Sequence, residues 1–138
     1  MLEGKRTKLE YEAFRKTLLQ DNERLISSFV DSIIVGPSGE YRPSIRSKVY
    51  FDRTEYEGQF LGDKREGRGI LHQKNGEKYL GEWKGDIMHG EGVYVFSNGE
   101  RYEGWFKMGV REGFGKYTFF NGNYYEGEWR EGTKFIKL

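Results

Sequence analysis

The sequence lacks cysteine, contains only two prolines and two histidines, and has no long uninterrupted run of apolar residues. The absence of cysteine excludes disulfide bonds and thiol chemistry and is compatible with a reducing compartment. The N-terminus has no apolar segment of a secretory signal, and a transmembrane helix would need about 18 apolar residues in succession. These absences lead us to expect a soluble cytoplasmic protein.

The sequence also lacks an excess of charge of one sign. It contains 23 lysines and arginines and 22 aspartates and glutamates, which gives a net charge of +1. Lysines alternate with glutamates, so the chain gives no reason to expect nucleic acid or an anionic membrane as a partner. Hydrophobic residues make up 36% and aromatic residues 17% of the sequence. This balance favours a thin sheet stabilised by rings over a thick aliphatic core.

Glycine and aromatic residues, in contrast, recur with a period of 23 residues in the C-terminal part of the chain. Each unit opens on Tyr-x-Gly-x-(Phe or Trp) and continues with Gly-x-Gly, and each complete unit closes on Asn-Gly. The units begin at Tyr56, Tyr79, Tyr102 and Tyr125, and the last one is truncated. Repeats of this length indicate an array in which each unit packs on its neighbours.

Each unit holds two short alternating runs bounded by glycine-rich turns, which predicts a β-hairpin rather than a helix. A two-residue Asn-Gly turn would divide the aromatic residues between the two faces of the sheet. A three-residue loop over 97–99, with its glycine left-handed, instead pairs Tyr94 with Tyr102 and Gly92 with Gly104. We expect the second register, because it keeps the aromatic set on one face.

The rings of this face are predicted to line a trough that binds a partner. They are Tyr56, Phe60, Tyr79, Trp83, Tyr94, Phe96, Tyr102, Phe106, Tyr117, Phe119, Tyr125 and Trp129. The opposite face carries mixed charge, interrupted by Leu80, Val93, Val95 and Trp105. We interpret these four as scattered surface residues, with a second docking patch as the alternative.

The combination of Tyr-x-Gly-x-(Phe or Trp), Gly-x-Gly and Asn-Gly at a step of 23 resembles the MORN repeat over about residues 56–132. The resemblance implies a mainly β fold, a single-layer, twisted antiparallel meander curled into a trough. It also implies a structural protein of the cytoskeleton, notably of cilia and flagella, as in the radial spokes of the axoneme. Two departures concern loop shape: Gln73 replaces an aromatic residue, and the turn glycine shifts from Gly62 and Gly85 to Gly109 and Gly132.

Residues 1–35 are predicted to contain an amphipathic helix from about 8 to 34, preceded by a capping box at 7–10. Its apolar docking face follows a spacing of mostly three or four residues and consists of Tyr11, Phe14, Leu18, Leu25, Phe29 and Ile33. Asp21 and Asn22 interrupt this stripe, so a break into two helices is the alternative. We expect the helix to pack on the chain's own aromatic trough; docking on a partner or on a second copy is the other interpretation.

Residues 36–47 contain both prolines and are predicted to form a linker. The sheet is predicted over 48–138, beginning with a degenerate capping strand at 48–55. The alternating residues 135–138 are expected to form its last edge, and the lysine there is typical of a protected edge.

Catalytic chemistry is not indicated by any constellation in the sequence. His72 and His89 are isolated, whereas a zinc site needs three or four converging ligands. No serine lies in a nucleophile elbow, and Glu57, Glu103 and Glu126 recur with the repeat, as framework surface residues would. We therefore expect a protein that is not an enzyme and that has no cofactor or metal.

The predicted function is that of a scaffold or adaptor in protein–protein interaction. The aromatic trough would bind a helical or extended segment of a partner in a larger assembly, and self-association is a further prediction. The alternative is a peripheral tether to phosphoinositides or other anionic lipids, using Lys64, Arg65 and Arg111 on the hairpin turns.

Overall fold

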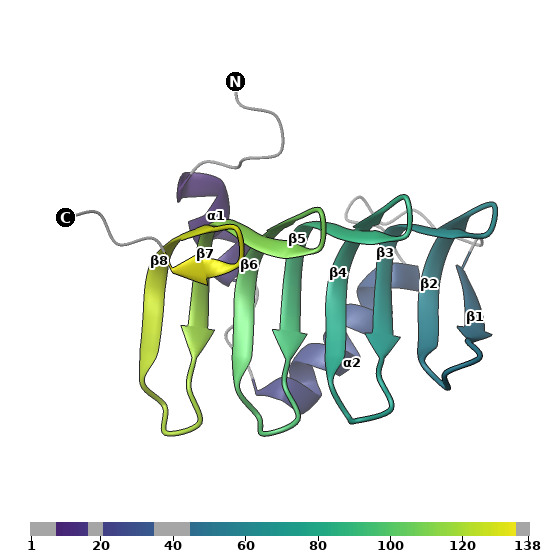
Figure 1. The fold of residues 1–138 in the computed structure, drawn as a ribbon, viewed down its shortest axis with the longest axis horizontal. Helices are drawn as coiled ribbons and strands as arrows, with labels where there is room; N and C mark the ends of the chain where they lie inside the picture. The colour runs from purple at the N-terminus through teal and green to yellow at the C-terminus, as the bar shows by residue number, and fades with distance from the viewer. Residues whose placement is uncertain (1–7, 17–20, 35–44, 135–138) are drawn as a thin grey trace.

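The computed structural model describes residues 8–16, 21–34 and 45–134, which form two helices and one nine-stranded sheet. The helices are α1 (Lys8–Lys16) and α2 (Asn22–Ile34). The strands are β1 (Ile45–Val49), β2 (Glu55–Leu61), β3 (Lys64–His72), β4 (Lys78–Lys84), β5 (Ile87–Val95), β6 (Arg101–Lys107), β7 (Val110–Thr118), β8 (Tyr124–Arg130) and β9 (Thr133–Lys134). The strands pair in chain order, and every pair is antiparallel (Figure 1). The predicted single-layer meander is thereby confirmed.

The predicted hairpin register within the repeats is also confirmed. Gly92 pairs with Gly104, and the amide of Phe96 donates to the carbonyl of Glu100 at 2.8 Å across the three-residue loop. The glycine of that loop, Gly99, has φ of 89°. These loops connect the ends of successive strands along one side of the sheet. We call this side, which runs across the strand ends, the loop edge.

Two-residue turns join the strands at the opposite edge of the sheet. Gly85 and Asp86 have φ of 53° and 75°, and Met108 and Gly109 have φ of 52° and 84°. Consecutive positive φ angles are the requirement of type I′ turns, which suit the right-handed twist of hairpins. The displaced turn glycine therefore changes its place within the turn, while the turn keeps its length.

A row of glycines crosses seven adjacent strands from β2 to β8. Its members pair directly with one another and are Gly58, Gly69, Gly81, Gly92, Gly104, Gly115 and Gly127. We call this set the glycine row. Because its members lack side chains, the first tyrosine of each unit can lie flat over them: Tyr79, for example, lies over Gly81 and Gly92.

The helices lie on the face opposite the aromatic rings, which corrects the expectation that they fill the trough (Figure 1). Leu25 of α2 is buried with Ile70, Leu80, Val93 and Val95. Leu80, Val93 and Val95 thus belong to a second core, and Trp105 is buried as well, so none of these four is a scattered surface residue. The physical reason is that the tyrosines lying over the glycine row already fill the aromatic face, whereas the aliphatic stripe on the other face has no cover of its own.

The predicted helix is divided at the position given as the alternative. The side chain of Asp21 accepts a hydrogen bond from the amide of Arg24 at 2.9 Å, which is the geometry of an N-cap. Asp21 is therefore the N-cap of α2, which begins at Asn22. Among the described residues, no helix is long and apolar enough to span a membrane.

The structure describes only some of the side chains on the predicted docking face of the helix. Tyr11 is buried and donates its hydroxyl to Glu126 at 2.7 Å, and Phe29 packs against the core around Leu25. The side chains of Phe14, Leu18 and Ile33 lie outside the described part of the structure.

The structure corrects the interpretation of Glu103 as a framework surface residue. Its side chain is buried and accepts a hydrogen bond from Arg101 at 2.6 Å. Arg101 also donates to the side chain of Asn22 at 3.0 Å, at the start of α2. The helix thus covers a carboxylate that the repeat pattern alone places on a surface.

The capping strand lies earlier than predicted, at Ile45–Val49 instead of 48–55, so it begins inside the predicted linker. The residues that follow form a turn in which Tyr50 donates its amide to the carbonyl of Thr54 at 2.8 Å. The repeats use the same bond, so the degenerate unit keeps the loop of the later units. The remainder of the linker and the predicted last edge at 135–138 lie outside the described residues, and β9 ends at Lys134.

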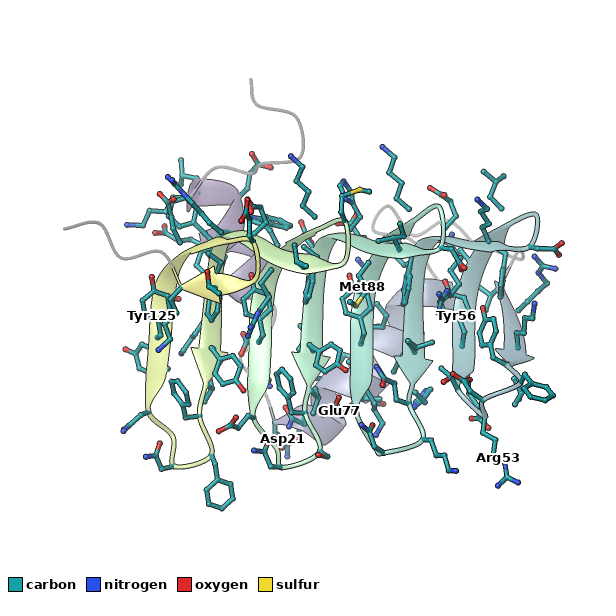
Figure 2. All side chains as sticks on the ribbon, in the orientation of Figure 1. Asp21, Arg53, Tyr56, Glu77, Met88 and Tyr125 are labelled. Atoms are coloured by element: carbon teal, nitrogen blue, oxygen red, sulfur yellow. The ribbon has the colours of Figure 1, made fainter. Side chains whose placement is uncertain are left out.

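Arg53 has φ of 70° and stands where the later loops carry Gly76, Gly99 and Gly122 (Figure 2). We expect Arg53→Gly to raise the free energy of unfolding by about 0.5–1 kcal/mol. The left-handed conformation costs a residue with a side chain about 1–2 kcal/mol, and the flexibility of glycine in the unfolded chain offsets part of the gain. Urea unfolding measures the change, with Arg53→Lys as a neutral control. A destabilised Arg53→Gly protein would contradict this interpretation.

Candidate functional site

The inner layer of the aromatic face is a chain of eight rings that cross one another edge to face. Neighbouring centroids lie 4.9–5.5 Å apart, with interplanar angles of 80–89°. In order, the rings are Phe60, Tyr56, Trp83, Tyr79, Phe106, Tyr102, Trp129 and Tyr125. We call them the ring chain. This geometry is the favoured one for aromatic pairs, and it joins each unit to the next.

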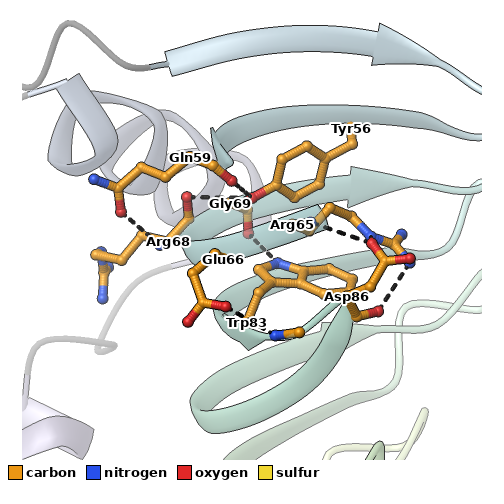
Figure 3. Close-up of polar contacts among 9 residues, drawn as sticks. Tyr56, Gln59, Arg65, Glu66, Arg68, Gly69, Trp83 and Asp86 are labelled. Carbon is orange, nitrogen blue, oxygen red and sulfur yellow. Dashed lines mark hydrogen bonds and ion pairs between the residues drawn. The ribbon is translucent and has the colours of Figure 1, made fainter. Parts of the chain in front are cut away.

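Hydrogen bonds to the backbone fix the polar ends of these rings. The hydroxyl of Tyr56 donates to the carbonyl of Gln59 at 2.7 Å, and the indole of Trp83 donates to the carbonyl of Gly69 at 3.2 Å (Figure 3). Tyr79, Tyr102 and Tyr125 repeat the tyrosine bond, and Trp129 repeats the indole bond by donating to the carbonyl of Gly115. Burial raises the pKa of Tyr79 well above its usual value, so its hydroxyl stays protonated as a donor.

Six of the twelve rings predicted to line the trough are buried in this layer. They are Tyr56, Tyr79, Trp83, Tyr102, Phe106 and Trp129. Since their surfaces are closed by neighbouring rings, they form a core and do not offer area to a partner. Phe60 and Tyr125, at the two ends of the ring chain, are half-buried.

The remaining four rings form a second line, nearer the loop edge, that is partly open to solvent. Tyr94, Phe96, Tyr117 and Phe119 are all half-buried. Successive centroids in this order lie 4.7, 5.5 and 4.9 Å apart, so the surface is continuous. We call these residues the ring row. It is the part of the predicted site that the structure leaves accessible.

Two glutamates, one repeat apart, border the ring row on the loop edge. Tyr94 donates its hydroxyl to Glu77 at 2.8 Å, and Tyr117 donates to Glu100 at 2.6 Å. Burial, together with these carboxylates, raises the pKa of both tyrosines to about 12. The hydrogen bonds from Tyr117 and from the amide of Phe120 lower the pKa of Glu100, so Glu100 is negatively charged at neutral pH.

Open hollows flank the row at its two ends. The hollow near β1, of about 630 Å³, is lined by Tyr50, Phe51, Asp52, Thr54, Arg65, Leu71, Gln73 and Asp86. The hollow near the loop between β7 and β8, of about 420 Å³, is lined by Glu100, Phe119, Phe120, Asn121 and Asn123. Phe51 and Phe120 occupy equivalent loop positions and are 108% and 79% exposed, so each hollow has an exposed ring beside it.

Two of the three cations predicted to contact lipid are bound to the chain itself. The guanidinium of Arg65 lies 4.4 Å from the ring centre of Trp83 and donates to Asp86 at 2.6 Å (Figure 3). Arg111, four strands away, lies 4.6 Å from the ring centre of Trp129 and donates to the carbonyl of Gly132 at 2.8 Å. Lys64 is exposed in β3. These contacts assign the two arginines a role in packing.

The part of the chain that the structure describes contains no cluster of side chains that could hold a metal ion. His72 lies in β3, and burial lowers its pKa. His89 lies in β5, where its Nδ1 accepts a hydrogen bond from the amide of Met108 at 3.5 Å.

Sequence reasoning missed the glutamates beside the ring row and the loop residues at its ends. A signal was present, because Glu77 and Glu100 differ by one period, and so do the tyrosines that they bind, Tyr94 and Tyr117. Counting one further period back from Gln73 reaches Tyr50, the first residue of the degenerate loop.

Comparison with known protein families gives a match to the MORN repeat at residues 56–78, 79–101, 102–124 and 125–134. The matched ranges begin at the four tyrosines that open the units, and together they cover more than half of the chain. Comparison with curated proteins gives no match. Repeats of this kind generally build non-enzymatic scaffolds that bind proteins or lipids. The chain belongs to the MORN-repeat family.

Proposed function

We propose that this protein is a non-catalytic scaffold whose ring row binds a helical or extended segment of a partner protein. The observation that carries the proposal is the continuous, half-exposed surface of Tyr94, Phe96, Tyr117 and Phe119. In the described part of the chain, the helices cover the opposite face. The ring row is therefore available to another polypeptide.

The layer beneath the ring row supports this function physically. Tyr117 lies 6.3 Å, centroid to centroid, from Trp129, which belongs to the buried ring chain. Rings held in this way have little conformational freedom left to lose on binding, which is a favourable condition for affinity. Aromatic residues are also enriched among the side chains that dominate binding energies at interfaces.

The setting that we propose is a cytoplasmic assembly of the cytoskeleton, such as the axoneme of a cilium or flagellum. This part of the proposal is supported by family resemblance alone, since a fold hosts many functions. The lipid tether has less support, because Arg65 and Arg111 already bind acceptors and rings of the chain. Self-association stays a prediction that light scattering can measure.

The ring row can be tested by substitution of its half-exposed rings, which leaves the fully buried rings in place. We expect the double substitution Phe96→Ala and Tyr117→Ala to weaken partner binding about 30-fold or more, since a central aromatic residue contributes about 2 kcal/mol or more. Affinity capture from cell extract, read by mass spectrometry, identifies the proteins that the intact chain retains and the variant loses. Binding of the purified partners then gives the ratio.

The matched control is Leu9→Ala, which removes an exposed apolar side chain from α1. Unfolding curves establish that each variant is folded. Substitution of Trp83 or Tyr102 is unsuitable for this purpose, because both are buried. Equal capture by the intact chain and by the folded double variant would exclude the ring row as the binding site.

A further inference from the structure

We infer that the segment bound by the ring row is an α-helix with an apolar stripe and one basic flank, and that Glu77 and Glu100 bind that flank. The inference rests on the proposed function of the ring row and names the class of partner. It follows from the hydrogen-bond donors, the repeat spacing and the charges around the row.

The hydrogen-bond donors of this face favour a helical partner over an extended one. The hydroxyls of Tyr94 and Tyr117 donate to glutamates, and the indole of Trp129 donates to the carbonyl of Gly115 at 3.1 Å. Apart from the cations Arg111 and Lys134 at the opposite edge, the described residues of the row therefore present apolar rings and acceptors. An extended or polyproline segment has no internal hydrogen bonds and needs donors from its groove, whereas a helix satisfies its own carbonyls.

The spacing of the repeats is compatible with a helix that crosses the strands. Equivalent residues one repeat apart lie two strands apart, or about 9.6 Å. Seven residues of a helix span about 10.5 Å. Side chains at i and i+7 would therefore meet equivalent rings, such as Phe96 and Phe119, with a mismatch of about 1 Å. Three residues of an extended chain span a similar length, so the donors and not the spacing decide the conformation.

The charged side chains around the ring row determine which flank of the partner helix is expected to be basic. Glu77 and Glu100 follow the loop edge, and each carboxylate oxygen has a second lone pair for a further donor. Arg111 and Lys134 enter the aromatic face from the opposite edge, and Lys134 lies 5.3 Å from the ring centre of Phe119. Lysines or arginines of the partner are therefore expected toward the loop edge, and neutral or acidic residues on the other side.

The opposite face of the same sheet shows that this architecture accepts a helix across its strands. There, Leu25 and Phe29 of α2, one helical turn apart, pack on a stripe that includes Ile70 and Leu80 (Figure 1). The ring row would receive its helix in a comparable way, with aromatic in place of aliphatic side chains.

Selection from two displayed peptide libraries on the full chain tests the inference. One library presents a 21-residue helical scaffold with randomised positions, and the other presents unstructured peptides that permit proline. We expect enrichment from the helical library, with apolar residues at a step of seven and lysine or arginine along one flank. The double substitution Glu77→Gln and Glu100→Gln should weaken the selected peptides about tenfold, because glutamine keeps the acceptor for tyrosine but removes the charge.

Asp63→Asn is the matched control, since it removes an exposed carboxylate at the opposite edge, and it should leave affinity unchanged. Enrichment of only extended or proline-rich peptides that require Phe96 and Tyr117 would overturn the helical partner while the proposed function stands. Full affinity for the double glutamine variant would overturn the role of the glutamates. Selected peptides that bind equally well after Phe96→Ala and Tyr117→Ala, or no enrichment at all, would overturn the proposed function together with this inference.

Discussion

The substitution Tyr102→Ala is expected to lower the free energy of unfolding by about 3–5 kcal/mol, the range for removal of a large aromatic side chain from a core. Tyr102 is fully buried within the ring chain. Its ring centroid lies 5.2 Å from those of Phe106 and Trp129. Truncation of this ring therefore removes one contact within its own unit and one contact with the next unit. Urea unfolding followed by circular dichroism measures the loss.

Tyr102→Phe separates the contribution of the ring from that of its hydroxyl. This variant removes only the hydrogen bond from Tyr102 to the carbonyl of Trp105, at 2.9 Å. We expect it to cost about 1 kcal/mol. If the alanine variant were no less stable than the phenylalanine variant, the ring chain would not be the core of the sheet.

The substitution Gly104→Ala is expected to destabilise the protein by about 3 kcal/mol, at the upper end of the range for overpacking. An added Cβ would lie 2.6 Å from the Cα of Gly115 and 2.6 Å from the carbonyl oxygen of Phe114. Both atoms belong to the backbone of the paired strand, so a side-chain rotation cannot relieve the collision. The two strands would have to separate, or Tyr102 would have to leave its place over the glycine row.

Gly76→Ala provides the comparison for this effect. Gly76 has φ of 91°, and an added Cβ would meet no atom within 4 Å. Its cost, about 1–2 kcal/mol, comes from backbone conformation alone. Similar losses at both positions in thermal unfolding would show that the glycine row does not require close approach of the strands.

The sheet was predictable because its determinants are local and periodic. Alternation fixes which side chains share a face, and the loop glycine fixes the register, as Gly92 and Gly104 show. The location of the helices could not be obtained in this way. Whether a face needs a cover depends on how deeply its own side chains fill it, and the tyrosines over the glycine row close the aromatic face through contacts between strands.

The candidate site was predicted as a set of rings, and its division into two layers was not. Tyr79 and Tyr94 share a face, yet the first is fully buried and the second is half-buried. Depth depends on side-chain direction, because Tyr79 lies over glycines while Tyr94 extends toward Glu77. A further signal was the pairing of Arg65 with Trp83, which recurs two repeats later as Arg111 with Trp129.

The ring chain also has a consequence for the length of the molecule. Each unit presents to the next the same tyrosine and the same bare backbone that it receives from the unit before it. A tandem duplication of 23 residues therefore inserts a module whose two sides already match, and it extends the sheet by about 9.6 Å. The length of the sheet therefore changes in whole steps of one repeat when units are added or removed.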